Sequence, residues 1–563
     1  MKKILLSMNR SISSKWILAC ILLLALILRF WSLGINPPGL TPDEAALGYN
    51  AYSILKTGRD EFGKTFPIIF KSFGDYKPGL YVYLDVPFVA ALGLNEVSTR
   101  LPSVFAGVLS VFLLYLIIKE LFHSLEIGKW KLEIVTAAVA ATNPWMIYFS
   151  RGAWEANVSL CLTLFGIYFF LKAIHNSKFI IHSSIFFALT LIIYQGAKLS
   201  SAIVLLILLI VYWNDFWKIK FKYLVLSLSL GIIISVPIIL SFFNGQTFRL
   251  TIFSIFSYRR PAAQVQTLLS EDNEKIGSLS YDLFHTESLN YVNAILGRYF
   301  NNFSGRFLFF EGDWANPIST APYQGVLLLA DIIFLPLGIF LVFKNKTQKG
   351  NWFVLFWLIL APFSSALSRD DLNAVRDLNL AVPMIIFISF GLFFALNWIS
   401  KQKYSLIYYL AAIGIYGFSL IYFLDALFVH LPVHNSNLWR YGYKQAVEYV
   451  TPLKSQYKNI VFEQSFDQPY IYFLYYQKYD PYRWQKQAHL VNSQYVGDVG
   501  FEQKIDNIQF KQIDWSALKN QHGTLVVSGP NSLPPDYQTN ATLVDQIKYL
   551  NGTDIAFDII KMK

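Results

Sequence analysis

Long runs of apolar residues recur along most of the chain, and short polar segments separate them. The runs have the length that a helix needs to cross a bilayer; they cover residues 16–34, 98–118, 132–149, 152–171, 179–195, 199–213, 223–243, 322–343, 352–367, 378–399 and 404–429. A shorter run from Leu80 to Leu94 is interrupted by Asp85 and Pro87, which favours a re-entrant or interfacial helix. The pattern predicts a polytopic α-helical membrane protein with about 11 transmembrane helices.

The chain changes character after residue 430. Short β-rich runs at residues 459–462 and 523–528 accompany a helix-like segment at residues 442–454. Alternating strands and helices suggest a small α/β domain. Neither a Gly-rich phosphate loop nor a metal-spaced set of His and Cys is recognisable there, so an accessory role is expected.

The chain is therefore divided into a membrane domain, residues 1–430, and a soluble accessory domain, residues 431–563. The membrane domain carries two large outer loops, residues 35–97 and 244–321. The first apolar run follows several basic residues but lacks a small-residue cleavage site, so it is expected to remain as an anchor.

The basic residues orient this arrangement. Seventeen Lys and Arg fall in one alternating set of short segments, against four in the other, namely Arg151, Lys198, Arg369 and Arg376. Cytoplasmic loops carry the excess of Lys and Arg. We therefore expect a multi-pass protein of the cell (plasma or inner) membrane, with a cytoplasmic N-terminus and with both large loops and the C-terminal domain outside.

Composition agrees with a membrane protein. With 54% hydrophobic and 15% charged residues, the chain is too apolar for an ordinary soluble enzyme. The net charge of +11 arises largely from the loop clusters, which argues against a nucleic-acid partner. Cys20 and Cys161 both lie in apolar runs, so neither a disulfide scaffold nor a Cys-based zinc site is expected.

Charged residues gather at the outer ends of the predicted spans. They are Asp43, Glu44, Asp75, Lys77, Arg100, Arg151, Glu155, Lys198, Arg369, Asp370, Asp371, Arg376 and Asp377. Charges at the edge of a membrane are costly and rare. We expect them to line an outer cavity that holds carboxylates and cations, which suits phosphate chemistry beside an acid or base.

The acidic pair also has a structural interpretation. Thr41, Pro42 and Glu44 have the spacing of a capping box with proline at the first helical position. Glu44 would then serve largely to hold the helix start, whereas Asp43, which the box does not use, is freer to face the cavity.

The other charges have structural alternatives as well. Arg100 could be an interface anchor, Glu155 could pair with Arg151 one turn earlier, and the run from Arg369 to Asp377 could be a solvated turn. The sequence leaves these alternatives open.

Three motifs occur in a characteristic order. The pair Asp43-Glu44 lies in the first outer loop, Lys77-Pro78 follows about thirty residues later, and residues 100–103, Arg-Leu-Pro-Ser, open the second span. This order resembles the C-type membrane glycosyltransferases (GT-C), specifically the superfamily of protein O-mannosyltransferases and lipid A aminoarabinose transferases. The resemblance covers about residues 35–240 and returns at residues 369–383.

The resemblance implies roles for individual residues. It makes Asp43 the catalytic base and Glu44 its acidic neighbour. Cations that bind the donor phosphate would be Lys77, Lys198 and Arg376, with Glu155 as a further cavity acid. Where many members have Lys-Pro-Pro, this chain has Lys-Pro-Gly. The resemblance fades in the loop 244–321, where the candidates for donor contacts are Arg249, Arg259, Arg260 and Arg298.

The expected function is that of an inverting glycosyltransferase on the outer side of the membrane. It would move a sugar from a polyprenyl-phosphate donor to a hydroxyl of a lipid, glycan or protein acceptor, without a cofactor. One alternative is an oligosaccharyltransferase-like enzyme with a divalent cation held by Asp43, Glu155, Asp370 and Asp371. Another is a lipid-linked sugar transporter or flippase, although the charges collect at one face rather than near the midplane.

Overall fold

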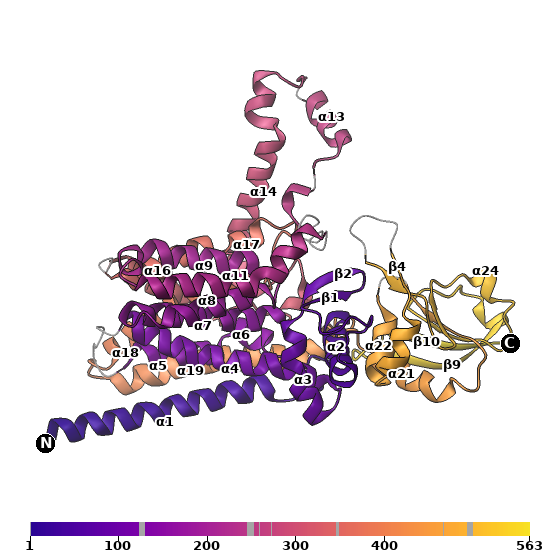
Figure 1. Cartoon of the computed structure of the whole chain (residues 1–563), viewed down its shortest axis with the longest axis horizontal. Helices are drawn as coiled ribbons and strands as arrows, with labels where there is room; N and C mark the ends of the chain where they lie inside the picture. Colours follow the sequence, from indigo (N-terminus) through magenta and orange to yellow (C-terminus); the bar gives the residue numbers. More distant parts are fainter. Residues whose placement is uncertain are drawn as a thin grey trace.

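The computed structural model describes residues 2–122, 130–244, 253–257, 259–271, 273–344, 348–464, 467–492 and 499–563, with the backbone alone for residues 2–13. Its helices lie side by side in an elongated bundle, and a strand-rich C-terminal region lies at one end (Figure 1). The N-terminus lies at the opposite end of the bundle from this region. The mostly helical architecture with a C-terminal sheet agrees with the sequence prediction.

The bundle consists of apolar helices of unequal length. They are α1 (Lys2–Phe30), α4 (Glu96–Leu121), α5 (Leu132–Thr142), α7 (Glu155–His175), α8 (Phe179–Leu191), α9 (Ala197–Val211), α11 (Phe221–Phe243), α15 (Asp331–Lys344), α16 (Lys349–Leu360), α18 (Ala381–Ile399) and α19 (Ser405–Asp425). Within the described residues, five helical segments are long and apolar enough to cross a membrane: 96–121, 155–175, 221–243, 378–399 and 405–434. The count of about 11 spans stays a prediction.

Two of the predicted spans are interrupted next to a proline. The run 132–149 divides into α5 and α6 (Pro144–Phe149) at Asn143, whose Oδ1 accepts a hydrogen bond from the Met146 amide at 3.0 Å. Asn143 is therefore an N-cap and Pro144 occupies the first helical position. The run 352–367 likewise divides into α16 and α17 (Phe363–Ala366) around Pro362.

The segment 35–97, predicted as the first outer loop, folds into two helices and a hairpin: α2 (Pro42–Thr57), β1 (Ile69–Ser72), β2 (Asp75–Pro78) and α3 (Leu80–Leu92). The hairpin turns at Phe73 and Gly74, whose φ angles of 54° and 84° are those of a type I′ turn. Strand register places Lys77 opposite Phe70. The hairpin thus gives Lys77 a fixed place beside α2.

The C-terminal region contains a six-stranded mixed sheet in the order β6-β7-β3-β8-β10-β9. The strands are β3 (Ile460–Glu463), β6 (Lys504–Ile505), β7 (Ile508–Lys511), β8 (Leu525–Ser528), β9 (Ala541–Lys548) and β10 (Ile555–Met562), while β4 (Leu490–Val491) pairs with β5 (Phe501–Glu502). Strand β3 is parallel to β7 and β8, and the other pairs are antiparallel.

Four helices accompany this sheet: α21 (Tyr443–Val450), α22 (Pro469–Tyr476), α23 (Pro481–Gln487) and α24 (Trp515–Leu518). The strands expected at residues 459–462 and 523–528 correspond to β3 and β8. The expected helix at 442–454 corresponds to α21 and the 3-10 turn Thr451–Leu453. These local predictions are confirmed.

Helix α2 lies between the bundle and the C-terminal region (Figure 1). The Tyr49 hydroxyl donates to the Tyr479 carbonyl at 3.1 Å, and the Tyr472 hydroxyl donates to the Leu40 carbonyl at 3.0 Å. At Gly48, an added Cβ would lie 2.6 Å from the Tyr475 ring, so only glycine permits this approach.

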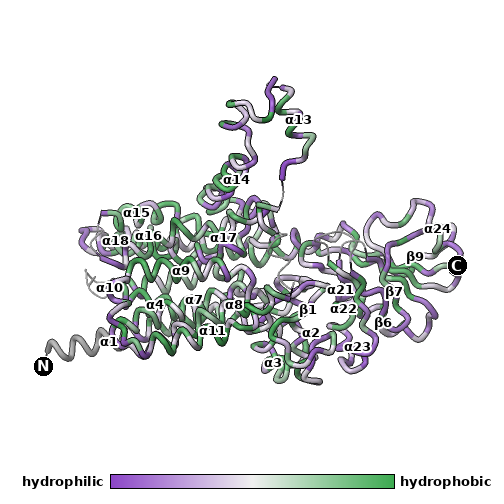
Figure 2. Tube along the Cα trace, turned by 45° about the horizontal axis from the view of Figure 1, so that its top comes forward, coloured by the Kyte–Doolittle hydropathy of each residue, from purple (hydrophilic) through white to green (hydrophobic). Residues whose placement is uncertain are grey.

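Hydropathy along the chain is high through the bundle and mixed around the sheet (Figure 2).

Candidate active site

The start of α2 has the capping box that the sequence predicts. Thr41 Oγ1 accepts a hydrogen bond from the Glu44 amide at 3.1 Å, and Glu44 Oε2 accepts one from the Thr41 amide at 3.1 Å. Pro42 occupies the first helical turn. The box fixes where α2 begins and therefore fixes the direction in which Asp43 leaves the helix.

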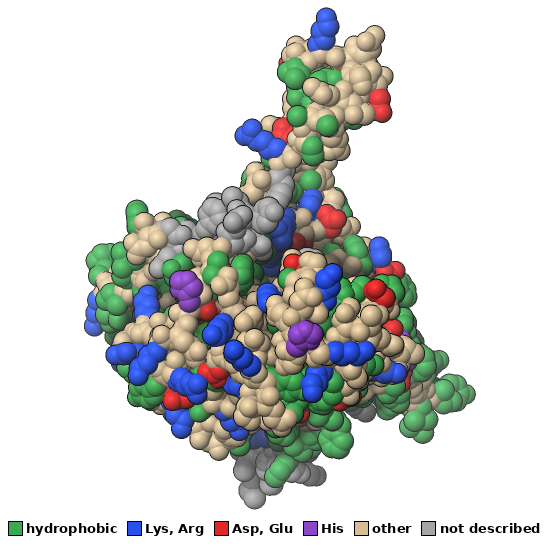
Figure 3. All heavy atoms as spheres, turned by 90° about the vertical axis from the view of Figure 1, so that its right-hand side faces the viewer, with side chains coloured by type: hydrophobic (Ala, Val, Ile, Leu, Met, Phe, Trp, Pro, Cys, Tyr) green, Lys and Arg blue, Asp and Glu red, His purple; other side chains and the backbone are tan. Residues whose placement is uncertain are grey.

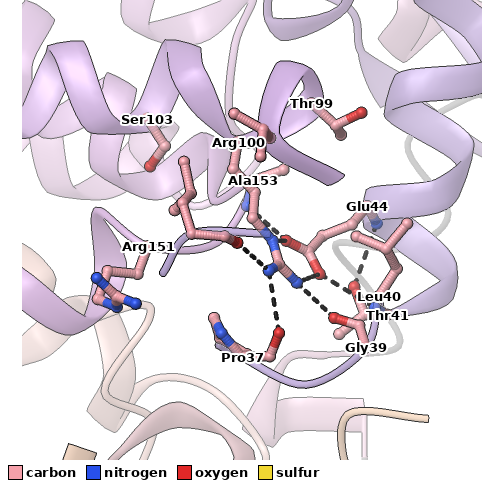
Figure 4. A network of polar contacts seen from close by, with 12 residues as sticks. Pro37, Gly39, Leu40, Thr41, Glu44, Thr99, Arg100, Ser103, Arg151 and Ala153 are labelled. Atoms are coloured by element: carbon pink, nitrogen blue, oxygen red, sulfur yellow. Dashed lines mark hydrogen bonds and ion pairs between the residues drawn. The ribbon is translucent and has the colours of Figure 1, made fainter. Parts of the chain in front are cut away.

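Glu44 is also the centre of a buried polar cluster (Figure 4). Arg100 Nε lies 3.1 Å from Glu44 Oε1, and that oxygen accepts a further hydrogen bond from the Ala153 amide at 2.8 Å. The Arg100 guanidinium also donates to the carbonyls of Leu33, at 2.9 Å, and Pro37, at 3.1 Å. The cluster joins α2, α4, the turn before α7 and the chain that follows α1.

The structure corrects the interpretation of Arg100 as an interface anchor. Its side chain is fully buried and its charge is paired with Glu44, so it does not reach toward a membrane surface. Buried charges are tolerated when they are paired and hydrogen-bonded. The sequence could not show this, because the partner lies 56 positions earlier in the chain.

Arg151 has a structural role of the same kind. Its guanidinium donates to the carbonyls of Leu28 at 3.0 Å and Asn36 at 2.8 Å, and it lies 4.8 Å from the Phe428 ring centroid. The last carbonyls of a helix have no partner within the helix. Arg151 supplies donors to the end of α1 and to the chain beyond it, apart from the Glu44 cluster (Figure 4).

Asp43 occupies the open side of the same helical turn. Its side chain is 61% exposed and pairs with Lys77 Nζ, whose own side chain is only 12% exposed. The ammonium also lies 5.5 Å from the Phe73 ring centroid. Lys77 is thus held in place by its surroundings, whereas its carboxylate partner faces a cavity.

This cavity measures about 550 Å³ and lies at the end of the bundle where α2 begins. It brings together residues that are far apart in the sequence: Asp43, Glu44, Lys77, Glu155, Lys198 and Arg376. Among the described residues, Asp75, Arg100 and Arg151 do not belong to its lining. Asp75 lies instead at the hairpin, in register with Ser72.

Lys198 reaches the cavity from the first turn of α9. Its ammonium donates to Gln195 Oε1 at 2.7 Å and lies 5.1 Å from the Phe242 ring centroid. Gln195 Nε2 in turn donates to the Tyr76 carbonyl at 2.9 Å. Gln195, which the sequence analysis did not single out, therefore connects Lys198 with the strand that carries Lys77. Its signal in the sequence was a polar side chain at the end of an apolar run.

Arg376 reaches the cavity from the loop before α18. Its Nη1 lies 3.0 Å from Asp370 Oδ2, and its guanidinium lies 5.1 Å from the Phe253 ring centroid. Phe253 and Ser254 also line the cavity, and neither carried a signal in the sequence. The segment 369–377 is thus part of the cavity wall rather than a simple solvated turn.

The loop 244–321 lines the cavity with Phe253, Ser254 and Ile318 rather than with its described candidate arginines. Arg249 lies outside the described residues. Arg260 pairs with Glu287 at 3.0 Å, and Arg298 pairs with Asp371 at 3.0 Å. Among the described residues, neither they nor Arg259 line the cavity.

The carboxylates proposed for a divalent cation have other partners here. Asp370 pairs with Arg376 and Asp371 with Arg298. In the part of the chain that the structure describes, no group of three or more His, Cys, Asp or Glu side chains could hold a metal ion.

Some buried charges were not singled out by the sequence analysis, and one of them lies within a predicted span. Arg29, within the first predicted span, is fully buried, and its Nε donates to Ser150 Oγ at 3.2 Å while Nη1 donates to the Ala141 carbonyl at 3.1 Å. The sequence did carry a signal for this residue, because an arginine inside an apolar run is rare. It anchors α1 to α5 and to the turn after α6.

Comparison with known proteins gives a fold but no sequence relative. No protein-family model matches the chain, and no curated protein matches it. A crystal structure of ArnT, a lipid A aminoarabinose transferase, from Cupriavidus metallidurans bound to undecaprenyl phosphate matches with a TM-score of 0.57 and 11% identity, over 97% of this chain and 98% of that chain. Its apo state matches with a TM-score of 0.55, at the same identity and coverage.

A weaker likeness is to the oligosaccharyltransferase of Archaeoglobus fulgidus, with a TM-score of 0.49 and 12% identity over 82% of this chain and 63% of that chain. The likeness to ArnT extends over nearly the whole of both chains. The chain therefore has the GT-C fold of the membrane glycosyltransferases, as the order of its sequence motifs predicted.

Proposed function

We propose that this protein is an inverting membrane glycosyltransferase that moves a sugar, a hexose or a pentose, from a polyprenyl-phosphate donor to an acceptor hydroxyl. The observation that carries the proposal is the cavity at the outer end of the bundle. It combines one exposed carboxylate, Asp43, with three cations, Lys77, Lys198 and Arg376. The similar structure of ArnT in complex with undecaprenyl phosphate supports a donor of this chemical class.

In the proposed step, the acceptor oxygen attacks the anomeric carbon of the donor sugar. The bond from that carbon to the phosphate oxygen breaks, its electron pair remains on the phosphate, and the acceptor proton passes to Asp43. A positioned general base contributes about 10² to 10⁴ in rate. The three cations stabilise the negative charge of the departing lipid phosphate, most effectively where water is excluded.

The pair Asp43–Lys77 explains how the site responds to its donor. Because the Asp43 side chain is 61% exposed, its pairing with Lys77 contributes little to stability, about 0 to 1 kcal/mol, so a phosphate can replace Asp43 as the partner of Lys77. Lys77 stays in place because its own side chain is largely buried. Donor binding then leaves the Asp43 carboxylate available to accept a proton.

The same proposal includes the arrangement in the membrane. The N-terminus is cytoplasmic, about eleven spans cross the membrane of the cell, and the cavity faces outward. Residues 431–563 form an extracytoplasmic accessory domain that holds α2 and the hairpin: the Gly500 amide donates to the Phe73 carbonyl at 2.7 Å. Because nucleotide sugars are made in the cytosol, an outward site requires a sugar carried across on a lipid.

The test is transfer activity of the purified full-length chain. Lipid-linked sugars that co-purify with it, identified by mass spectrometry, supply the donor. Asp43→Asn keeps the side-chain size and removes the base, and we expect it to lower the turnover rate about 10² to 10⁴-fold. Full activity of Asp43→Asn would exclude it as the base.

The matched control is Asp75→Asn, which changes a carboxylate of the hairpin that carries Lys77 but does not line the cavity, and it should retain activity. Activity that survives a chelator would assign phosphate stabilisation to the side-chain cations. Activity abolished by a chelator and restored by a divalent cation would favour the oligosaccharyltransferase-like alternative.

A further inference from the structure

The described residues between 259 and 303, here called the arm, extend sideways from the bundle. Helix α14 (Glu287–Asn301) runs across the direction of the spanning helices, and α13 (Ala262–Glu271) lies farther toward the sheet (Figure 1). The Tyr299 hydroxyl donates to the Ile359 carbonyl at 2.9 Å, and its ring lies 5.2 Å from that of Phe363. Since α16 ends at Leu360, the arm begins at the outer end of the bundle.

Helix α14 has two unlike faces. Its polar face binds the protein: Arg298 donates to the Arg369 carbonyl at 2.9 Å, and Asn301 Nδ2 donates to the Asp371 carbonyl at 3.1 Å. The opposite face carries Val292, Leu296 and Phe300, which are 49%, 48% and 64% exposed. Residues four apart share one face of a helix, so the three form a stripe that points away from the loop 369–371.

Other large apolar side chains are exposed along the arm. They include Ile276, Leu279, Leu283 and Phe284, between 54% and 77% exposed. Figure 3 shows hydrophobic side chains on the surface of the arm where it projects from the rest of the molecule. Neither α13 nor α14 buries a residue within the described chain.

The position of the stripe on the molecule indicates which kind of surface covers Val292, Leu296 and Phe300. The arm leaves the bundle at the end of a spanning helix and runs across the bundle direction, which is the direction of a membrane surface. Its polar face is bound to the loop 369–371, and its apolar face is the one left exposed. An amphipathic helix that lies in the interface has these features.

We propose that the arm lies on the outer surface of the lipid bilayer, with Val292, Leu296 and Phe300 inserted among the acyl chains. The proposal rests on the membrane orientation given above under the proposed function. It has a consequence for the cavity: Arg298 holds the loop 369–371, and Asp370 of that loop pairs with Arg376. Lipid contact along α14 would therefore help to hold the cavity wall.

Spin labels on the full-length chain in phosphatidylcholine and phosphatidylglycerol vesicles test the proposal. One label is attached at Leu296→Cys and a matched one at Gln266→Cys, an exposed polar position on α13, both with Cys20 and Cys161 replaced by Ser. Oxygen concentrates in lipid, whereas a nickel chelate stays in water. We expect the ratio of oxygen to nickel accessibility to be several-fold higher at residue 296 than at residue 266.

Equal ratios at the two positions would overturn the proposal. So would low accessibility of residue 296 to both reagents, because the stripe would then be covered by protein, either a second copy or another partner. If Leu296→Cys does not yield folded protein, Val292→Cys reports on the same stripe. The measurement uses no sugar transfer, so its outcome is independent of whether the catalytic assignment holds.

Discussion

The two sides of the first turn of α2 carry neighbouring carboxylates with opposite environments. Glu44 is 4% exposed and shares a buried cluster with Arg100 at the edge of the cavity lining; Arg100 itself is fully buried. The Asp43 side chain, one position earlier, is 61% exposed and pairs with Lys77 at the mouth of the cavity. One helical turn therefore presents one acid to the interior and one to a prospective substrate.

The difference shows how burial divides structural from chemical roles. A buried ion pair has lost its water, so neither partner can leave without exposing the other to an apolar interior. An exposed pair can exchange its partner for solvent or ligand at little cost. Glu44 therefore positions the helix, and Asp43 is available for chemistry.

Removing a member of the buried pair should have the largest effect. Arg100→Met leaves Glu44 buried without its guanidinium, and we expect the free energy of unfolding to fall by about 3 to 5 kcal/mol. Thermal unfolding of the detergent-solubilised protein, followed by tryptophan fluorescence, measures the loss. Asp43→Asn is the matched control on the open side and should stay within about 1 kcal/mol of the wild type. If both variants lost the same free energy of unfolding, the buried and the open side of the first turn of α2 would not differ as described here.

Removing the cation on the open side should have a smaller effect, confined to the donor. Lys77→Ala deletes one charged hydrogen bond to phosphate, and we expect affinity for polyprenyl phosphate to fall about 10- to 100-fold with the fold intact. Titration calorimetry measures the affinity. Lys71→Ala, on the other strand of the same hairpin, is the control and should bind normally; unchanged binding by Lys77→Ala would take Lys77 out of the phosphate site.

A local effect of pH concerns a buried carboxylate held by neutral groups. Glu61 accepts a hydrogen bond from Asn50 Nδ2 at 3.1 Å and lies 3.5 Å from the Tyr470 hydroxyl of α22. Burial raises the pKa of Glu61 to about 8 and that of Glu502, on β5, to about 7. Because these pKa values are raised in the folded state, the stability they contribute is complete at low pH and is lost as the pH rises through them.

We therefore expect the attachment of the C-terminal region to α2 to weaken between about pH 5 and pH 8. Hydrogen exchange across α22 (Pro469–Tyr476) measures it, as protection that decreases with rising pH after correction for the intrinsic rate. Glu61→Gln should flatten this dependence. Protection that increases with pH would contradict the assignment. Glu61, which has neutral hydrogen-bond partners, would then not differ in this respect from Glu44, which is paired with the Arg100 guanidinium.

Features that depend on neighbouring residues were predictable from the sequence. The capping box of Thr41 and Glu44, the strands β3 and β8 and the GT-C fold itself were confirmed. Helix lengths were less predictable, since Asn143 and Pro144 end one helix and begin another inside a continuous apolar run. Hydropathy does not register such a break, because a proline costs a helix a hydrogen bond without making the run polar.

The sequence by itself determined which charges lie near the ends of the apolar runs. Tertiary structure alone decided which of them face the cavity: it turned Arg100 and Arg151 inward to Glu44 and to backbone carbonyls, and it brought Lys77 and Arg376 into the cavity that Asp43 lines. The physical reason is that burial and pairing depend on partners distant in the chain. A carboxylate or guanidinium has the same local signature whether it is paired in the interior or open to a ligand.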